Sequence, residues 1–168
     1  MSNNFKILVI GDKSVGKTSV CTRYVHCIFS EEIPRTNGVN HFLKSITYKK
    51  QKINLFFWDT SGEENNYRIY KDASLCIVVF SLINRDSFVN VKKWKKILDE
   101  HLKLAKSKRI PSILIGNMCD IPDIEIKEND IKKSCETNKF LSWFQVSAKT
   151  NFQMQTFSEF IIKTLMKD

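Results

Sequence analysis

One short stretch of the chain has residue types and a spacing that suit phosphate chemistry. Residues 11–18 are Gly-Asp-Lys-Ser-Val-Gly-Lys-Thr and fit the pattern G-x-x-x-x-G-K-[ST]. A strand-like apolar run at residues 5–10 precedes them, and a helix-compatible run at residues 18–25 follows. Backbone N–H groups in such a loop, together with the helix N-terminus, favour a bound phosphate chain. The order strand, loop and helix therefore predicts a P-loop and disfavours a simple lysine-bearing glycine turn.

The residue types within this loop each have a physical reason. Gly11 and Gly16 let the backbone pass close to phosphates, where a Cβ atom would collide. Lys17 is expected to bring a positive charge to the terminal phosphates, and the Thr18 hydroxyl is expected to ligate Mg²⁺. The predicted nucleotide-binding residues of this segment are Asp12, Lys13, Ser14, Val15, Gly16, Lys17, Thr18 and Ser19.

Three residues farther along the chain suit the rest of a nucleotide site. Asp59 ends a hydrophobic run, where a carboxylate is poorly placed unless it meets a cation, so we expect it to act on Mg²⁺ directly or through water. Gly62 lacks a Cβ and can bring its N–H to a terminal phosphate. Asp120 offers two acceptor oxygens to the N1–H and 2-amino donors of guanine, a donor pair that adenine lacks. Asp120 therefore predicts selectivity for guanine.

The elements that must position these residues alternate between strand and helix. Predicted strands are residues 5–10, 42–48, 53–58, 75–80, 113–115 and 141–146, the second and third forming an antiparallel hairpin. Predicted helices are residues 18–25, 87–104 and 127–138, with a closing helix around Phe157, Phe160, Ile161 and Leu165. A polar loop is expected at residues 29–40. The alternation predicts one α/β domain over residues 1–168 with a mostly parallel sheet.

Four polar clusters follow predicted strands and should therefore meet. They are residues 11–18, 59–62, 117–120 and 147–149. Ligands of open α/β sheets bind outside the carboxyl ends of the strands. Convergence of the four clusters on one rim of the sheet is stronger evidence for a nucleotide site than any one cluster alone.

Composition excludes several other classes of protein. No apolar run approaches the roughly 18 residues of a membrane span, and no secretory signal precedes the first strand. Five cysteines without a C-x-x-C motif suit a reducing cytosol and argue against a disulfide framework or a zinc site. The formal charge of +9, with lysines clustered at residues 49–52 and 92–96, could attract nucleic acid or an anionic membrane. Because no nucleic-acid motif accompanies the lysines, we expect a solvated basic face and no nucleic-acid partner.

The same residues, taken together, resemble the Ras superfamily of small GTPases and its Rab branch most closely. Residues 58–62, Trp-Asp-Thr-Ser-Gly, resemble the family's W-D-T-A-G. Residues 117–120, Asn-Met-Cys-Asp, resemble N-K-x-D, and residues 147–149, Ser-Ala-Lys, resemble the base-binding S-A-K loop. Residues 86–94 are similar to the Rab-type third helix. The resemblance covers almost the whole chain and implies a P-loop NTPase fold with a six-stranded, mostly parallel sheet flanked by helices.

The resemblance also implies roles for individual residues. Thr36 stands at the position of the family's switch I threonine, which would ligate Mg²⁺ together with Thr18 and Asp59. Phe29 stands at the position of the aromatic residue that packs against guanine. At the base, Ala148 would bind guanine O6, Ser147 would support Asp120, and Lys149 would lie over the ring. Asn117, followed by Met118, would tie the base loop to the P-loop. The implied catalytic residues are Lys17, Thr36, Gly62 and Glu63, and the implied cofactors are GTP or GDP with Mg²⁺.

Several departures from the Rab pattern concern hydrolysis and effector binding. Glu63 stands where the family has a glutamine that positions water, and a carboxylate accepts hydrogen bonds but donates none. Lys13 stands at a position that is often glycine, and Met118 replaces the lysine of N-K-x-D. Asn40 and His41 replace an acidic-aromatic pair. Residues 63–72 are about four residues shorter than the corresponding Rab segment.

Two functions follow from this comparison. The first is a GTP/GDP switch with slow hydrolysis in vesicle traffic, with an exchange factor, a GTPase-activating protein and effectors as partners. The second is a GTP-locked interaction module. A P-loop nucleotide kinase is disfavoured by Asp120 and by the lack of a lid-like arginine cluster. The protein is expected in the cytoplasm or on the cytosolic face of an endomembrane, to which a tail absent from this chain would attach it.

Lys13 and Glu63 could also act together. Both positions flank the γ-phosphate in the resembled fold, so the two side chains could form an ion pair in which Lys13 offsets the carboxylate. The alternative is that both side chains point into solvent. The sequence leaves these two arrangements open.

Overall fold

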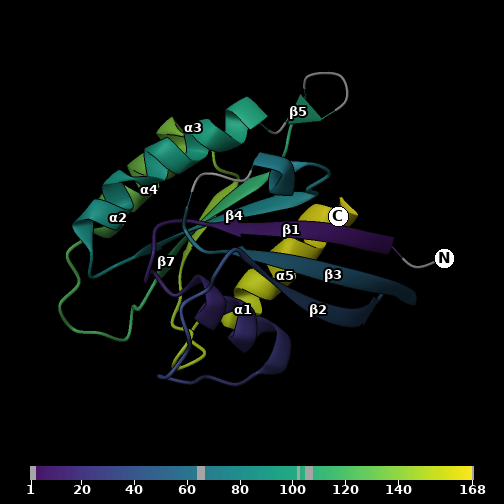
Figure 1. Ribbon diagram of the computed structural model, residues 1–168, viewed down its shortest axis with the longest axis horizontal. Coiled ribbons are helices and arrows are strands. Elements are labelled where there is room, and N and C mark those ends of the chain that lie inside the picture. The colour runs from purple at the N-terminus through teal and green to yellow at the C-terminus, as the bar shows by residue number, and fades with distance from the viewer. Residues whose placement is uncertain (1–2, 64–66, 102, 105–107, 168) are drawn as a thin grey trace.

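The structure is a computed structural model that describes residues 3–63, 67–101, 103–104 and 108–167 (Figure 1). Its elements in chain order are β1 (Asn3–Ile10), α1 (Lys17–His26), β2 (Val39–Tyr48), β3 (Gln51–Thr60), the 3₁₀ helix η1 (Tyr67–Tyr70), β4 (Leu75–Ser81), α2 (Arg85–Val89), α3 (Val91–His101), β5 (Lys103–Leu104), β6 (Lys108–Arg109), β7 (Ser112–Asn117), α4 (Glu128–Thr137), β8 (Ser142–Gln145) and α5 (Met154–Met166). The predicted α/β class and six-stranded sheet are confirmed.

The main sheet has the order β2-β3-β1-β4-β7-β8, and only the β2–β3 pair is antiparallel. Its register explains why the polar clusters meet. Val9, two residues before Gly11, lies opposite Asp59, and Asn117 lies opposite Ser81 at the same edge. Parallel strands that end level with one another place the loops after them side by side.

Both faces of the sheet are covered by helices, with α1 and α5 on one face and α2, α3 and α4 on the other (Figure 1). The central strand β1 shows why both coverings are needed. Ile7 and Val9 belong to the first core, whereas Leu8 and Ile10 belong to the second, because successive side chains point to opposite faces. All four are fully buried, as expected for a strand in a parallel sheet.

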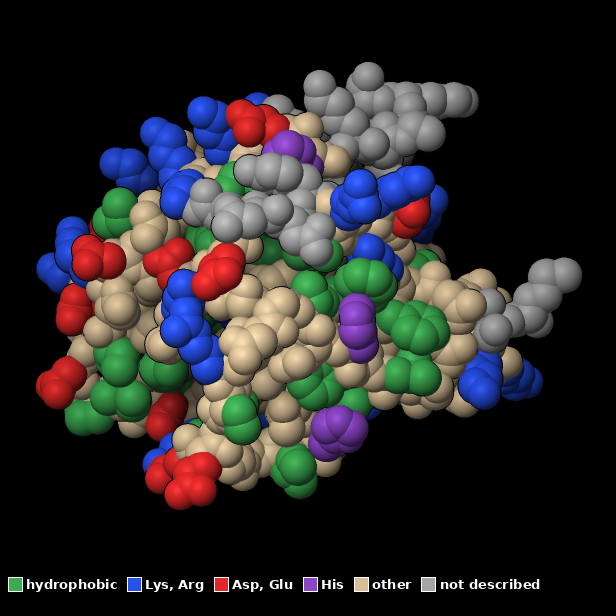
Figure 2. All heavy atoms as spheres, viewed as in Figure 1, with side chains coloured by type: hydrophobic (Ala, Val, Ile, Leu, Met, Phe, Trp, Pro, Cys, Tyr) green, Lys and Arg blue, Asp and Glu red, His purple; other side chains and the backbone are tan. Residues whose placement is uncertain are grey.

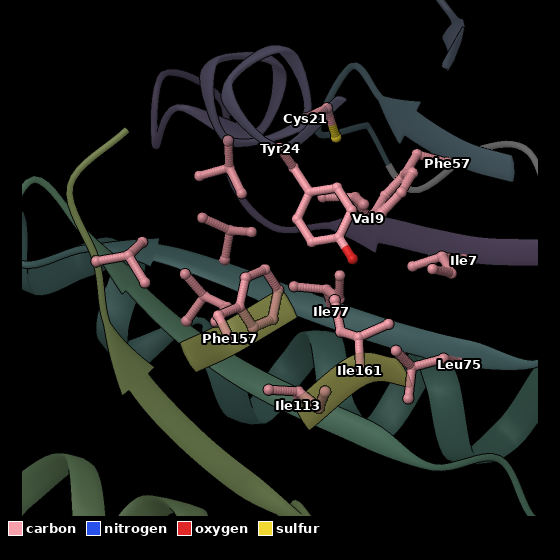
Figure 3. Packing of buried hydrophobic residues seen from close by; sticks show 14 of the residues in the cluster. Ile7, Val9, Cys21, Tyr24, Phe57, Leu75, Ile77, Ile113, Phe157 and Ile161 are labelled. Atoms are coloured by element: carbon pink, nitrogen blue, oxygen red, sulfur yellow. The ribbon is translucent and has the colours of Figure 1, made fainter. Parts of the chain in front are cut away.

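The mainly aliphatic core beneath α1 and α5 contains a group of packed aromatic rings. Tyr24 of α1 lies over the sheet, with ring centroids 4.7 Å from Phe57 and 6.0 Å from Phe157 of α5 (Figure 3). The Tyr24 hydroxyl accepts a hydrogen bond from Ser158 at 2.9 Å, so this buried polar tip has a partner. Burial raises the pKa of Tyr24 to about 12. These contacts hold α1, and therefore the P-loop before it, against the sheet.

The predicted helix over residues 87–104 was wrong in its extent. The structure divides this segment at Asn90, a residue type with low helix propensity, into α2 and α3, and α3 ends at His101. Asn84 caps α2 by accepting from the Ser87 amide at 2.9 Å. Residue 102 lies outside the described residues, and residues 103–104 pair with residues 108–109 in a two-stranded ribbon that the sequence did not predict.

The basic face lies over α2 and α3, where Figure 2 shows lysine and arginine side chains gathered. Lys92, Lys93 and Lys96 are exposed there, as expected. Lys95 departs from that expectation, because it is 4% exposed and donates to Asp99 at 2.5 Å. Within the described residues, no helix is both long enough and apolar enough to cross a bilayer.

Candidate nucleotide-binding site

A cavity of about 610 Å³ opens at the carboxyl edge of the sheet. The predicted site residues that line it are Lys13, Ser14, Gly16, Lys17, Thr18, Ser19, Phe29, Thr36, Asn117, Met118, Asp120, Ala148 and Lys149. Residues that line it without having been predicted are Ser30, Glu31, Ile33, Pro34, Arg35, Ser61 and Ile121. The four polar clusters therefore converge as the sequence indicated, and the loop between α1 and β2 supplies most of the additional wall.

The P-loop glycines are required by the protein itself as well as by any phosphate. A Cβ on Gly11 would lie 2.0 Å from the backbone oxygen of Val79 in β4. A Cβ on Gly16 would lie 2.3 Å from the side-chain nitrogen of Asn117, and Gly16 has a φ of 86° at the start of α1. Both substitutions would push the loop away from the strands that anchor it.

Lys17 lies almost entirely inside the loop, with 5% of its surface exposed. Its ammonium group donates to the backbone oxygens of Gly11 at 3.1 Å and Asp12 at 2.6 Å. Burial lowers the pKa of Lys17 to about 8, although the nearby Asp59 and Asp12 carboxylates act in the opposite direction. A buried ammonium with a lowered pKa is suited to a strongly anionic ligand, because the ligand would supply the charge that the protein only partly provides.

Thr18, Thr36 and Asp59, the three predicted metal ligands, are in mutual contact. The Thr18 hydroxyl donates to Oδ2 of Asp59 at 2.7 Å, and the two threonine hydroxyl oxygens are 2.9 Å apart. Asn40 donates to the Thr36 hydroxyl at 3.2 Å, so the residue at the usual acidic position holds the switch threonine. This arrangement brings together three oxygen-bearing side chains from the P-loop, the loop before β2 and the end of β3.

Asp59 provides the test of whether a cation fits. The residue is fully buried, and its Oδ1 has no hydrogen-bond partner. Burial raises the pKa of this carboxyl group, while the Thr18 hydrogen bond and Lys17 lower it. A buried carboxylate oxygen without a partner is costly unless a cation meets it.

Among the described residues no cluster of three or more His, Cys, Asp or Glu could hold a metal, so the donor set is one carboxylate with hydroxyls. Such hard oxygen donors, with room left for phosphate oxygens and water, fit Mg²⁺.

The base end of the cavity, which we define as residues 117, 118, 120, 148 and 149, is joined to the P-loop through Asn117. This residue is 2% exposed, donates to the Val15 oxygen at 3.1 Å and accepts from the Ala148 amide at 3.3 Å. Arg23 of α1 donates to the backbone oxygens of Ala148 at 2.7 Å and Lys149 at 2.9 Å. The implied tie between the base loop and the P-loop is therefore present in the structure.

Ser147, which directly precedes the base-end residue Ala148, and Met118 have partners that the sequence did not indicate. The Ser147 hydroxyl accepts from the Thr150 amide at 2.9 Å, so it stabilises the turn of its own loop rather than the expected Asp120. The sulfur of Met118 accepts from the Ser81 hydroxyl at 3.3 Å, and Met118 has a φ of 69°. Asp120 itself is exposed at the mouth of the cavity, where its carboxylate is accessible to a base.

Beside the cavity, Glu63 forms an ion pair with the P-loop residue Lys13. Lys13 and Arg35 line the cavity, Glu63 does not, and we define these three residues as the hydrolysis end. Lys13 Nζ lies 2.8 Å from Glu63 Oε1, and Arg35 lies 3.7 Å from the same oxygen. The hydrogen bond from Lys13 and its charge lower the pKa of Glu63. The two side chains thus meet rather than pointing separately into solvent, although about half of each remains exposed. Gly62 packs next to them, and a Cβ there would lie 2.8 Å from the Lys13 amide nitrogen.

A second exposed ion pair crosses the mouth of the cavity at the base end. Lys149 lies 2.7 Å from Glu31, which comes from the loop before β2. The pairing lowers the pKa of Glu31 and raises that of Lys149. The sequence did not indicate Glu31 and Arg35 as site residues, because charged residues in this loop belong to no recognisable motif. It did not indicate Arg23 either, because the position of a residue in a helix does not show which distant loop its side chain will contact.

Several predicted residues stand behind the cavity wall rather than on it. Val15 and Ser147 are buried, and the Asp12 side chain is bonded to α3, so any contact with a phosphate would come from its backbone. Part of the polar segment 63–72 falls on residues 64–66, which lie outside the described residues. Roles for that segment rest on Glu63 and on the residues from 67 onward.

Comparison with known proteins agrees with this geometry. The chain matches the Ras family over residues 6–167. It is 37% identical to the Ras-related protein Rab-32A of Dictyostelium discoideum, over 98% of this chain and 78% of the relative. It is 35% identical to human Ras-related protein Rab-32, over 96% and 75% of the two chains, and 32% identical to human Ras-related protein Rab-7L1, over 98% and 83%. The family match and the identity to these Rab proteins show that the chain belongs to the Ras family of small GTPases and to its Rab branch.

Proposed function

We propose that this GTPase is a guanine-nucleotide switch in membrane traffic, forming one G domain over residues 1–168, and that its intrinsic hydrolysis of GTP is slow. The observation that carries the proposal is the Lys13–Glu63 ion pair beside a P-loop from which Lys17, Thr18 and neighbouring residues line the cavity. Members of this family bind GTP and GDP with Mg²⁺ and respond to exchange factors, GTPase-activating proteins and effectors. Partners of these three kinds are proposed for this chain.

The binding roles follow the positions of the side chains. Lys17 would neutralise the terminal phosphates, and the Gly62 amide would bind the last of them. Thr18, Thr36 and Asp59 would hold Mg²⁺, which supplies charge neutralisation between the phosphates. At the base end, Asp120 would accept the guanine donors, the Ala148 amide would bind O6, and Phe29 and Lys149 would contact the ring. Each of these roles is a proposal. Placement around one cavity supports the roles of all these residues except Asp59 and Gly62, which do not line it. The roles of those two are supported by the hydrogen bond from Thr18 to Asp59 and by the close approach of Gly62 to the P-loop backbone.

Hydrolysis would be slow because Glu63 cannot do what glutamine does. A water must be oriented by a group that accepts one hydrogen bond and donates another, and a carboxylate only accepts. Its negative charge would also oppose a γ-phosphate. Lys13 offsets that charge but holds the carboxylate oxygen at 2.8 Å, directed toward the ammonium group. The residue is therefore retained by a neighbour rather than left free to position water.

The switch itself would act through Thr36, in the loop before β2, and Gly62, just after β3. Binding of the γ-phosphate would fix both, and its loss would release them, exposing or hiding an effector surface. In the structure Thr36 is already held by Thr18 and Asn40. These contacts favour an ordered switch I and also support the second candidate function, a GTP-locked interaction module.

A single-turnover assay separates the two candidates. Purified protein loaded with GTP would be followed for release of phosphate, with and without added cell extract. A slow rate that the extract increases supports the switch. No measurable release in either condition, with GTP still bound, supports the locked module. Failure of the protein to retain any guanine nucleotide would contradict both. Proposed localisation on the cytosolic face of an endomembrane is tested separately, by fractionation of cells that express the native protein.

A further inference from the structure

Asp12 belongs to the P-loop, yet its side chain turns away from the cavity toward α3. Its Oδ1 accepts from the indole nitrogen of Trp94 at 2.7 Å, and its Oδ2 accepts from the amide of Asn90 at 2.7 Å. Asn90 and Trp94 are four residues apart, and the Trp94 amide donates to the Asn90 oxygen at 3.0 Å. Asn90 directly precedes α3, and its side chain and that of Trp94 reach the same carboxylate. A single carboxylate therefore ties the P-loop to the start of α3.

The chemistry of the contact favours a carboxylate. Both partners present N–H donors, and an ionised carboxylate accepts from both at once. An asparagine at position 12 could accept from Trp94 and would meet Asn90 only after the Asn90 amide turned over, and both hydrogen bonds would lose the charge of the carboxylate. Trp94 is 2% exposed, so an indole N–H deprived of its partner would have little access to water.

The backbone of Asp12 links this tie to the buried lysine. The Asp12 oxygen accepts from Lys17 at 2.6 Å, and the Gly11 oxygen accepts from the same group at 3.1 Å. On the other side of the turn, a Cβ on Gly62 would lie 3.0 Å from the Asp12 carbonyl carbon. The Asp12 turn is thus enclosed by α3, Lys17 and Gly62. The contact with Asn90 and Trp94 therefore also fixes the backbone oxygens of Gly11 and Asp12, which accept hydrogen bonds from the Lys17 ammonium group.

We propose that Asp12 is a positioning residue for nucleotide binding. By anchoring the P-loop to Asn90 and Trp94, it fixes the carbonyl oxygens that aim Lys17 at the β-phosphate of the nucleotide. The proposal rests on the phosphate-binding role of Lys17 given under Proposed function. It makes α3 part of the structure that determines how long nucleotide stays bound, although no residue of α3 lines the cavity in the described part of the chain.

Exchange of donor and acceptor across the contact tests the proposal. Asp12→Asn leaves two amide groups facing each other, and Asn90→Asp leaves two carboxylates. In the double variant, the amide at position 12 can accept from Trp94 and donate to the carboxylate at position 90, so the contact is complementary again. Asp123→Asn, which changes an exposed loop aspartate, is the matched control. Release of a fluorescent GDP analogue from full-length protein with Mg²⁺ is measured for all four variants.

We expect Asp12→Asn to release the analogue about tenfold faster, because a charge-assisted hydrogen bond is lost. The double variant should return to within about threefold of the parent rate, a non-additive recovery that neither single change predicts. The control should be unchanged. Release by Asp12→Asn at the parent rate, or strictly additive effects in the double variant, would overturn the proposal.

Two further measurements separate positioning from a merely structural role. If Asp12 acts through Lys17, Asp12→Asn should weaken GDP more than GMP, which lacks the β-phosphate, in a calorimetric titration. Equal losses for both would indicate general disruption and overturn the proposal.

The indole N–H resonance of Trp94, assigned with Trp94→Phe, should shift in Asp12→Asn. If Asp12→Asn does not fold, Trp94→Phe replaces it, with an expected increase in release of about threefold for one lost hydrogen bond; release at the parent rate would then overturn the proposal. Absence of GDP binding by the parent protein would instead contradict the proposed function.

Discussion

Asn117 at the base end of the cavity is 2% exposed, and both the nitrogen and the oxygen of its side-chain amide form hydrogen bonds. Glu63 at the hydrolysis end is about half exposed, and its ion-pair partner Lys13 is equally open to solvent. The base end is built on strand ends and on hydrogen bonds to backbone groups. The hydrolysis end is built on charges carried by loops. One cavity therefore combines two regions with different means of support.

The difference concerns how strongly each region is held. Buried hydrogen bonds are shielded from water, and breaking one leaves an unsatisfied group that is costly to bury. Exposed ion pairs are screened by solvent and salt and contribute little. The comparison implies that nucleotide binding tolerates few changes, while the hydrolysis rate can be altered by single surface substitutions without loss of the fold.

The largest expected effect lies at the base end. Asp120→Asn should weaken GDP by about a thousandfold and admit xanthine nucleotides. The amide offers one acceptor and one donor, which mismatch the two donors of guanine but match the N1–H and 2-oxo groups of xanthine. Competition of labelled GDP by GTP, XTP and ATP measures this. The parent protein should reject ATP, and Asp123→Asn should behave like the parent. Equal displacement of GDP by ATP and GTP from the parent would remove the base assignment.

The next effect is at the phosphates, where the two ends share the P-loop. Lys17→Ala or Thr18→Asn should weaken GDP with Mg²⁺ by about a hundredfold, because a charged contact or a metal ligand is lost. Thr22→Asn on the same helix serves as the control and should bind normally. Titration with and without Mg²⁺ distinguishes the two variants, since only Thr18→Asn should lose the dependence on the ion. Unchanged affinity in both would exclude the P-loop from binding.

A smaller effect is expected at the hydrolysis end, and in the opposite direction. Glu63→Gln should increase single-turnover hydrolysis about tenfold, because the amide can orient a water molecule and carries no charge. GDP affinity should stay the same, which would separate the two ends directly. A slower Glu63→Gln variant would show that the carboxylate works as a base and is not an obstacle.

The ion pair itself is tested by a double-mutant cycle. Lys13→Gly alone should slow hydrolysis about threefold, because the Glu63 charge is then uncompensated beside the phosphate. Combined with Glu63→Gln, the same change should have no harmful effect and should give a rate similar to that of other Rab proteins. Phosphate release from the parent, the two single variants and the double variant provides the coupling. If the effects simply add, Lys13 and Glu63 act independently despite their contact.

The smallest effect concerns the exposed pair at the base end. Glu31→Gln removes the partner of Lys149 and should increase the rate of GDP release by less than about threefold, because solvent already screens the pair. Added salt should reduce even that difference. Glu32→Gln, at the neighbouring exposed residue, is the control. A tenfold increase in release would mean that exposed charges support the base end after all, and the contrast between the two ends would fail.

Much of the fold follows from local pattern. The apolar runs at residues 75–80 and 113–115 became β4 and β7, and strand ends that carry polar residues became the cavity, because side chains alternate across a strand and parallel strands end at one edge. The boundaries were less predictable. Asn90 interrupts a segment whose apolar spacing suits one helix, and residues 103–104 pair with residues 108–109 as strands that no pattern indicated.

The sequence alone determined the ligand-binding chemistry of this protein. Gly11, Gly16, Lys17 and Thr18 lie within the single stretch 11–18, and Asp120 ends the short motif at residues 117–120. Each is therefore recognised from its neighbours along the chain. Only the tertiary structure decided how that chemistry is supported. Asp12 meets residues 78 and 82 positions away, and Arg23 reaches residues more than a hundred positions away. Such contacts depend on which helix covers which face of the sheet, and this is settled by the packing of the whole core rather than by any local run of residues.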